Sequence, residues 1–274
     1  MPPEAVIDIV SLLSDDDRAF VVGGQALNLW AEHYAQSAPE LHAFRPFTSK
    51  DIDYFGQKEV AIKLANALNA KLRLPDIGDA TFQTAAVEAE VNGVHIQIDF
   101  LNHVLGISRG IEAGVVDLII PYTQGGAKAT VTVRLMHPLH CLQSRVANII
   151  KLRRTDEIAR RQAEAAPIVL RAFIADALAD GDQQAATDTL QALFKYLRRD
   201  YYGRDAHKIL SHDPLEIIRH FSDDERIDTR YRSNNMVAML AEVARHRTAL
   251  ASEREFSFLA SKGIAHPPMF RAVR

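Results

Sequence analysis

Two aspartates, Asp51 and Asp53, stand on either side of a single isoleucine in the segment TSKDIDYFG, residues 48–56. This segment is expected to begin a strand, in which alternate residues point to the same side, so both carboxylates would face one space. Aspartate is a poor strand former, and like charges at this spacing repel each other. A divalent cation such as Mg²⁺ or Mn²⁺ would offset the repulsion by taking the carboxylate oxygens as ligands. The other interpretation is a pair of solvated acids at a strand end.

Asp99 is a third candidate ligand. It lies in VHIQIDFL, residues 94–101, whose alternation places Asp99 on the polar face of a strand. A single aspartate on such a face is normally only part of the surface. If this strand lies beside that of Asp51 and Asp53, the three carboxylates would form a site for two metal ions.

Two adjacent glycines, Gly23 and Gly24, separate an apolar strand from a helix. The strand is AFVV, residues 19–22, and the helix QALNLWAEHY, residues 25–34, carries its large apolar side chains at helical spacing. Glycines at such a turn let a phosphate approach the backbone, where the N–H groups at the helix start are free to bind it. The alternative is a tight turn that needs a positive φ angle.

A basic stretch follows the first half of the chain. Between positions 145 and 161 there are only two acidic residues, Asp156 and Glu157, and six basic ones: Arg145, Lys151, Arg153, Arg154, Arg160 and Arg161. The stretch predicts a contact with a triphosphate or with RNA phosphates, Arg145 and Lys151 being the first candidates. A solvated helical surface is an equal alternative. Nearby, His137 and His140 lack a third ligand, which favours a role at a helix start over zinc binding.

The elements that must position these residues indicate an α+β fold. A mixed β-sheet head flanked by helices is expected over 1–136, followed by an all-helical domain over 137–274. The head should contain strands at 19–22, 51–55, 115–120 and 129–135, helices at 25–34 and 60–70, and a loop over 35–47. Residues 82–101 predict a hairpin that turns at Asn92-Gly93. Tail helices are expected at 139–153, 156–179, 182–199, 214–221 and 234–252.

The composition is that of an ordinary globular protein. Of 274 residues, 47% are hydrophobic and 24% charged, and the net charge of −3 offers no global attraction for nucleic acid. The single cysteine, Cys141, is typical of a reducing compartment. No basic and apolar leader and no apolar run of about 18 residues is present. We therefore expect a cytoplasmic protein without a membrane partner.

The order of these motifs resembles that of a known superfamily. An apolar residue followed by two glycines, then Asp-apolar-Asp, then an aspartate between apolar residues is similar to the nucleotidyltransferase (DNA polymerase β-like) superfamily. VVGGQALNLW followed by FTSKDIDYF resembles more narrowly the AbiEii-type and MenT-type nucleotidyltransferases, the toxins of type IV toxin–antitoxin pairs. Ser49 stands two residues before Asp51, as in that group, and PLHCLQSRVANIIKL, residues 138–152, is similar to its basic helix after the core.

The resemblance implies a metal-dependent transfer of a nucleoside monophosphate from a nucleoside triphosphate to a hydroxyl group. The acceptor would be a tRNA end, a protein or a small molecule, and a cognate antitoxin would be a partner. Asp51 and Asp53 would bridge the metal ions, and Asp99 would hold the ion that activates the hydroxyl. The remaining contacts to the nucleotide would come from Gly23, Gly24, Ser49, Lys50, Arg145 and Lys151. Two other classes stay open: a catalytically silent nucleotide- or partner-binding protein of the same fold, and a helical adaptor whose acids are surface charge.

Overall fold

A computed structural model describes most of the chain. The described residues are 7, 9–13, 18–48, 51–76, 81–91, 94–108, 110–124 and 127–261. Three predicted features lie outside them: Ser49 and Lys50 of the candidate site, and the Asn92-Gly93 turn.

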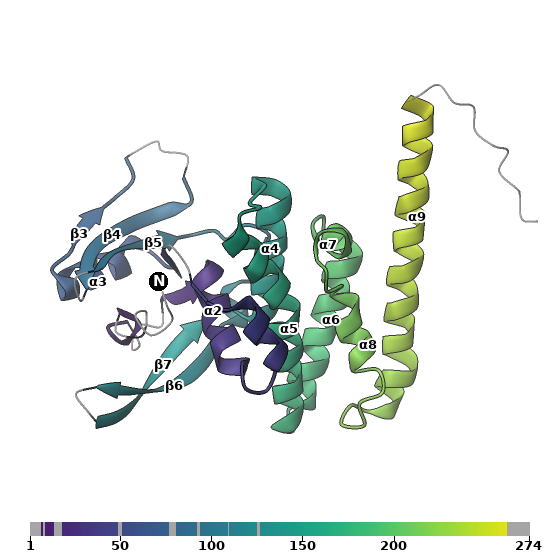
Figure 1. The fold of residues 1–274 in the computed structure, drawn as a ribbon, viewed down its shortest axis with the longest axis horizontal. Helices are drawn as coiled ribbons and strands as arrows, with labels where there is room; N and C mark the ends of the chain where they lie inside the picture. The colour runs from purple at the N-terminus through teal and green to yellow at the C-terminus, as the bar shows by residue number, and fades with distance from the viewer. Residues whose placement is uncertain are drawn as a thin grey trace, which may run out of the picture.

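A seven-stranded mixed sheet forms one side of the molecule (Figure 1). Its order is β3-β4-β5-β2-β1-β7-β6. The β2–β5 and β1–β7 pairs are parallel, and the other pairs are antiparallel. The strands are β1 (Phe20–Val22), β2 (Ile52–Phe55), β3 (Lys71–Arg73), β4 (Gln83–Val91), β5 (Val94–Leu101), β6 (Val116–Gln124) and β7 (Ala127–Leu135).

Helices cover the sheet and extend away from it in successive layers, from α2 and α4 through α5 and α6 to α9 at the far side (Figure 1). The α-helices are α2 (Gly23–Tyr34), α3 (Lys58–Leu68), α4 (Pro138–Leu152), α5 (Glu157–Ala179), α6 (Gln183–Arg199), α7 (Ala206–Ile209), α8 (Leu215–His220) and α9 (Val237–Ser261). The short helices are the 3₁₀ turns η1 (Pro39–Phe44), η2 (Glu112–Gly114) and η3 (Gly203–Asp205), and the π-helix η4 (Tyr231–Met236). No helix among the described residues is long and apolar enough to cross a membrane.

The predicted α+β class is confirmed, as are the 82–101 hairpin and the long tail helices. The prediction of a loop over 35–47 is wrong, because η1 occupies Pro39–Phe44. Proline at its first position supplies a suitable φ angle, a local preference that an apolar period does not reveal. The short strand β3 and the short helix α7 were not expected from the sequence.

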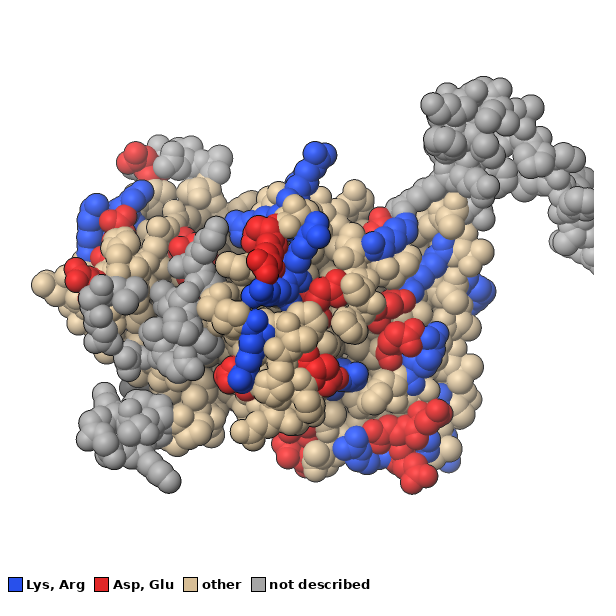
Figure 2. Space-filling model, in the orientation of Figure 1, with Lys and Arg blue, Asp and Glu red and all other residues tan. Residues whose placement is uncertain are grey.

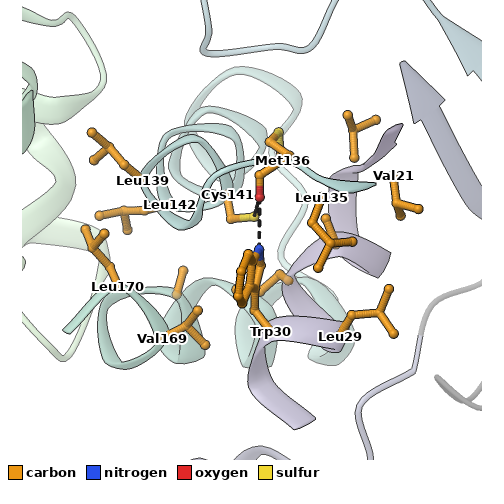
Figure 3. Packing of buried hydrophobic residues seen from close by; sticks show 14 of the residues in the cluster. Val21, Leu29, Trp30, Leu135, Met136, Leu139, Cys141, Leu142, Val169 and Leu170 are labelled. Carbon is orange, nitrogen blue, oxygen red and sulfur yellow. Dashed lines mark hydrogen bonds between the residues drawn. The ribbon is translucent and has the colours of Figure 1, made fainter. Parts of the chain in front are cut away.

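The core is continuous from the sheet into the helices, and Trp30 is one of its largest buried side chains. The Trp30 indole Nε1–H donates to the Met136 carbonyl oxygen at 3.0 Å, and the Cys141 thiol donates to the same oxygen at 3.6 Å (Figure 3). Leu135 of β7, Leu142 of α4 and the apolar side chains of α5 pack around the ring (Figure 3). These contacts fix α2, α4 and α5 against the sheet.

The start of α4 explains the histidine pair. His137 is the N-cap of α4, and its Nδ1 accepts a hydrogen bond from the Leu139 N–H at 3.0 Å. Burial is the main reason that the pKa of His137 falls to about 3, so the ring is neutral and able to accept. The predicted role at a helix start is thus confirmed for His137.

Candidate active site

One cavity gathers most of the candidate residues. It has a volume of about 590 Å³ and lies between the sheet, α2 and the α4–α5 pair. Its walls include Gly23, Gly24, Asp51, Asp53, Asp99 and Arg145. Residues separated by more than a hundred positions in the chain therefore face one space.

Strand register brings two of the carboxylates together. β2 and β5 run parallel, and their register sets Asp53 directly beside Asp99. β1 pairs with β2 on its other side, so that Val22 lies opposite Asp53 and the glycines follow at once. Asp51 precedes β2 by one residue and lines the same cavity. In parallel strands, side chains of paired residues lie on the same face, so the carboxylates of Asp53 and Asp99 both belong to the cavity floor.

Asp53 carries the most perturbed carboxyl group of the site. Desolvation by burial is the largest cause, and together with the charges of Asp99 and Asp51 it raises the pKa of Asp53 to about 6. Arg145 and Arg154 act in the opposite direction and hold the pKa down. A carboxylate that is partly buried, beside other acids, is a group that a cation would stabilise.

The two glycines make room for side chains of the site. Gly23 has a φ angle of +69°, and a Cβ atom at this position would lie 2.3 Å from Asp53 Oδ2. A Cβ atom on Gly24 would lie 2.6 Å from Gln162 Nε2. The turn therefore needs glycine for its backbone conformation at Gly23, and the close approach of Asp53 needs it as well.

We expect Gly23→Ala to destabilise the protein by about 2–3 kcal/mol, because it combines a strained φ angle with a clash at Asp53. Gly181→Ala is the matched control. Gly181 has a φ angle of +80° with no atom within 4 Å of its Cβ position, so it reports backbone strain alone, about 1 kcal/mol. Urea unfolding of both variants measures the difference. Equal losses of stability would contradict the close packing of Asp53 on Gly23.

Arg145 belongs to a buried polar network between three helices. It is 8% exposed, and its Nη1–H donates to Gln162 Oε1 at 3.0 Å. Gln162 Nε2 donates to Asn28 Oδ1 and to the Thr48 carbonyl oxygen, each at 3.4 Å. The network thus joins α4, α5 and α2 to the segment that leads into Asp51. Burial lowers the pKa of Arg145, and the charge of Asp53 opposes this shift.

Asp99 is held by two amides from the polar face of the hairpin. Gln83 Nε2 donates to Asp99 Oδ1 at 2.7 Å, and Gln97 Nε2 donates to the same oxygen at 3.0 Å. Within the described ranges, no group of three or more His, Cys, Asp or Glu side chains is placed to hold a metal ion. The chemistry of the donors suits Mg²⁺, since carboxylates are its preferred protein ligands, but the three acids line one cavity without converging on a common point.

Only some of the other residues predicted for the site line the cavity. Arg145 is on the cavity wall, whereas the side chain of Lys151 is exposed and Arg154 lines the cavity instead. Ser49 and Lys50 lie outside the described residues. Sequence reasoning did not single out Gln162, although it also lines the cavity. A glutamine within the alanine-rich run of α5 is the only sequence signal for it.

Comparison with known proteins adds no family to this geometry. No protein-family model, no curated protein and no solved structure matches the chain. The resemblance to nucleotidyltransferases therefore stays a prediction based on the motifs, and the function proposed below depends on residues of this chain.

Proposed function

We propose that the protein is a metal-dependent nucleotidyltransferase that moves a nucleoside monophosphate from a nucleoside triphosphate to a hydroxyl acceptor. The observation that supports this most strongly is the register of β2 and β5, which sets Asp53 beside Asp99 in a cavity that also contains Gly23, Gly24 and Arg145. Acids beside a glycine turn and a buried arginine are the groups that a triphosphate and its counter-ion require.

In this proposal, Asp51, Asp53 and Asp99 would move together from their places around the cavity to hold Mg²⁺ or Mn²⁺. The ion would supply charge neutralisation at the phosphates. Arg145 and Arg154 bind phosphate oxygens from the α4–α5 wall. Arg145 suits this role because its buried Nε–H has no hydrogen-bond partner in the described part of the chain, which leaves a donor of the guanidinium unused. The backbone at Gly23 and Gly24 offers further N–H donors at the start of α2.

Asp99 would orient the acceptor hydroxyl and accept its proton. For this, its carboxylate must turn from Gln83 and Gln97 toward Asp53.

The acceptor proposed first is RNA, such as a tRNA end, with a protein hydroxyl as the other candidate. The basic residues of the 145–161 stretch support RNA, because Arg154 belongs to it and lines the cavity. On the face drawn in Figure 2, Lys and Arg side chains lie among Asp and Glu side chains. RNA contacts would therefore be local to the cavity mouth.

A second candidate is a catalytically silent protein of the same kind that binds a nucleotide. Two observations favour it: Asp99 is engaged by two glutamines, and the described acids do not form a ready metal site. This candidate predicts nucleotide binding without transfer of label to any acceptor.

The test is incubation of the full chain with each of the four α-labelled nucleoside triphosphates, Mg²⁺ and either bulk RNA or a protein extract. We expect label on one acceptor class and complete loss of labelling when the cation is chelated. Nucleotide binding by calorimetry without any labelling would favour the silent protein. If the protein shows no nucleotide binding and no labelling, both candidates are contradicted.

A further inference from the structure

Phe82 is a large apolar side chain left in solvent at the edge of the cavity. It is 61% exposed, although it directly precedes β4 and most aromatic rings of the sheet are buried. The ring of His103 lies against it, with 4.6 Å between the ring centroids and an angle of 39° between the planes. Both residues line the cavity that contains Asp99.

The backbone fixes this ring pair in place. The Asn102 N–H donates to the Phe82 carbonyl oxygen at 3.0 Å, so the open end of the β4–β5 hairpin sets Phe82 beside the residues that follow β5. A few residues later, Gly106 packs so closely on α4 that a Cβ atom there would lie 2.7 Å from the Ala147 Cβ. The segment that follows His103 therefore packs on the same helix that carries Arg145.

The walls of the cavity differ in chemistry. Arg145 and Arg154 supply positive charge from the helical side, the three acids lie on the floor, and Phe82 and His103 supply aromatic surface beyond Asp99. A nucleotide has the matching division, with an anionic phosphate chain at one end and a flat base at the other. Aromatic side chains bind bases by stacking on their faces.

We propose that Phe82 and His103 form a stacking platform for a nucleobase bound at the carboxylate cavity. This inference depends on the proposed function for the presence of a nucleotide, and it adds the subsite that binds the base. Because stacking uses the π-face that every base has, the platform accepts all four bases, with purines favoured by their larger surface. The base comes either from the nucleoside triphosphate or from the end of an RNA acceptor.

Calorimetry on the full chain in the presence of Mg²⁺ tests the platform with three probes: ATP, inorganic tripolyphosphate and a short single-stranded oligoadenylate. The variants are Phe82→Ala, which removes the ring, and Phe82→Tyr, which keeps it. Tyr201→Ala is the matched control, because Tyr201 is an exposed aromatic residue, 68% accessible, that does not line the cavity.

We expect Phe82→Ala to weaken ATP binding about tenfold and to leave tripolyphosphate binding unchanged, since the latter has no base. Phe82→Tyr and Tyr201→Ala should bind ATP as the wild type does. If the loss in Phe82→Ala is confined to the oligoadenylate, the platform holds the base of the acceptor, and the proposal stands with that source.

The platform would be overturned if Phe82→Ala bound ATP as tightly as the wild type does, and likewise oligoadenylate. The proposed function would remain intact in that case, provided that ATP binds. An equal loss for ATP and tripolyphosphate would also overturn the platform, because the ring would then act on the whole site. If the wild type binds none of the three probes, the proposed function and the platform fail together.

Discussion

Asp53→Asn is expected to abolish nucleotidyl transfer and, without a divalent cation, to make the protein more stable at neutral pH. The loss of transfer should reach at least about a thousandfold, because in the proposed reaction several kcal/mol of charge stabilisation at the phosphates would depend on this carboxylate. The gain in stability follows from its environment. Burial raises the pKa of Asp53 to about 6, so the ionised form is disfavoured in the folded protein even with Arg145 nearby.

The pH dependence of stability explains why Asp53→Asn should be more stable than the wild type. The pKa of Asp53 is higher in the folded than in the unfolded chain. Ionisation of Asp53 therefore destabilises the fold fully above about pH 6, and the effect decreases as the pH falls and vanishes only below about pH 4. The difference between the ordinary pKa of 3.8 and the value of about 6 corresponds to about 3 kcal/mol. Asparagine has no such charge, and all other groups titrate in both proteins.

Urea unfolding in the presence of a chelator, between pH 4 and pH 8, measures this difference. The stability of Asp53→Asn relative to the wild type should rise from about 0.5 kcal/mol at pH 4 to about 3 kcal/mol at pH 7. Asp117→Asn is the control, because Asp117 lies on β6 with its side chain 61% exposed. A difference that does not vary with pH would show that burial does not disfavour the ionised form of Asp53.

Arg145→Met is expected to weaken the binding of a nucleoside triphosphate by about ten- to a hundredfold, the value of one charge-assisted hydrogen bond lost at a desolvated site. Methionine has similar length, so the packing of α4 should be retained. Since the positive charge of Arg145 holds the pKa of Asp53 down, its removal should also move the pH-dependent change in stability to higher pH.

Calorimetry with ATP and Mg²⁺ provides the first measurement, and the unfolding series described for Asp53 provides the second. Arg199→Met is the matched control, because Arg199 is exposed at the end of α6, away from the cavity. Unchanged ATP affinity in Arg145→Met would remove Arg145 from the phosphate site. An unchanged pH profile would mean that its charge does not reach Asp53.

Local patterns in the sequence predict the elements that hold the acids. The alternation in residues 94–101 correctly gives Asp99 a polar face, because period two is a property of any strand with one buried side. The glycine pair correctly marks the passage from β1 to α2. Such patterns do not predict the pairing of β5 with β2, since it depends on contacts between residues that are 46 positions apart in the chain.

The groups around the acids were harder to predict for the same reason. Gln162 reaches the site from α5 and contacts Arg145 and the Gly24 backbone region, and nothing in its own segment announces these contacts. Gln83 contacts Asp99 across the hairpin, and this requires the exact register of β4 and β5. Phe82 resembles any strand residue in the sequence, and only its exposure beside the cavity distinguishes it.

The central claim is that Asp53 and Asp99 share a divalent cation when a nucleotide is bound. A crystal structure of the full chain with Mn²⁺ and a non-hydrolysable nucleoside triphosphate, with the ion located by its anomalous scattering, tests it most directly. We predict an anomalous peak within ligand distance of carboxylate oxygens of both residues, with Asp99 turned away from Gln83 and Gln97. A nucleotide in the cavity with no peak there, and with Asp99 still bound by the two glutamines, would contradict the claim.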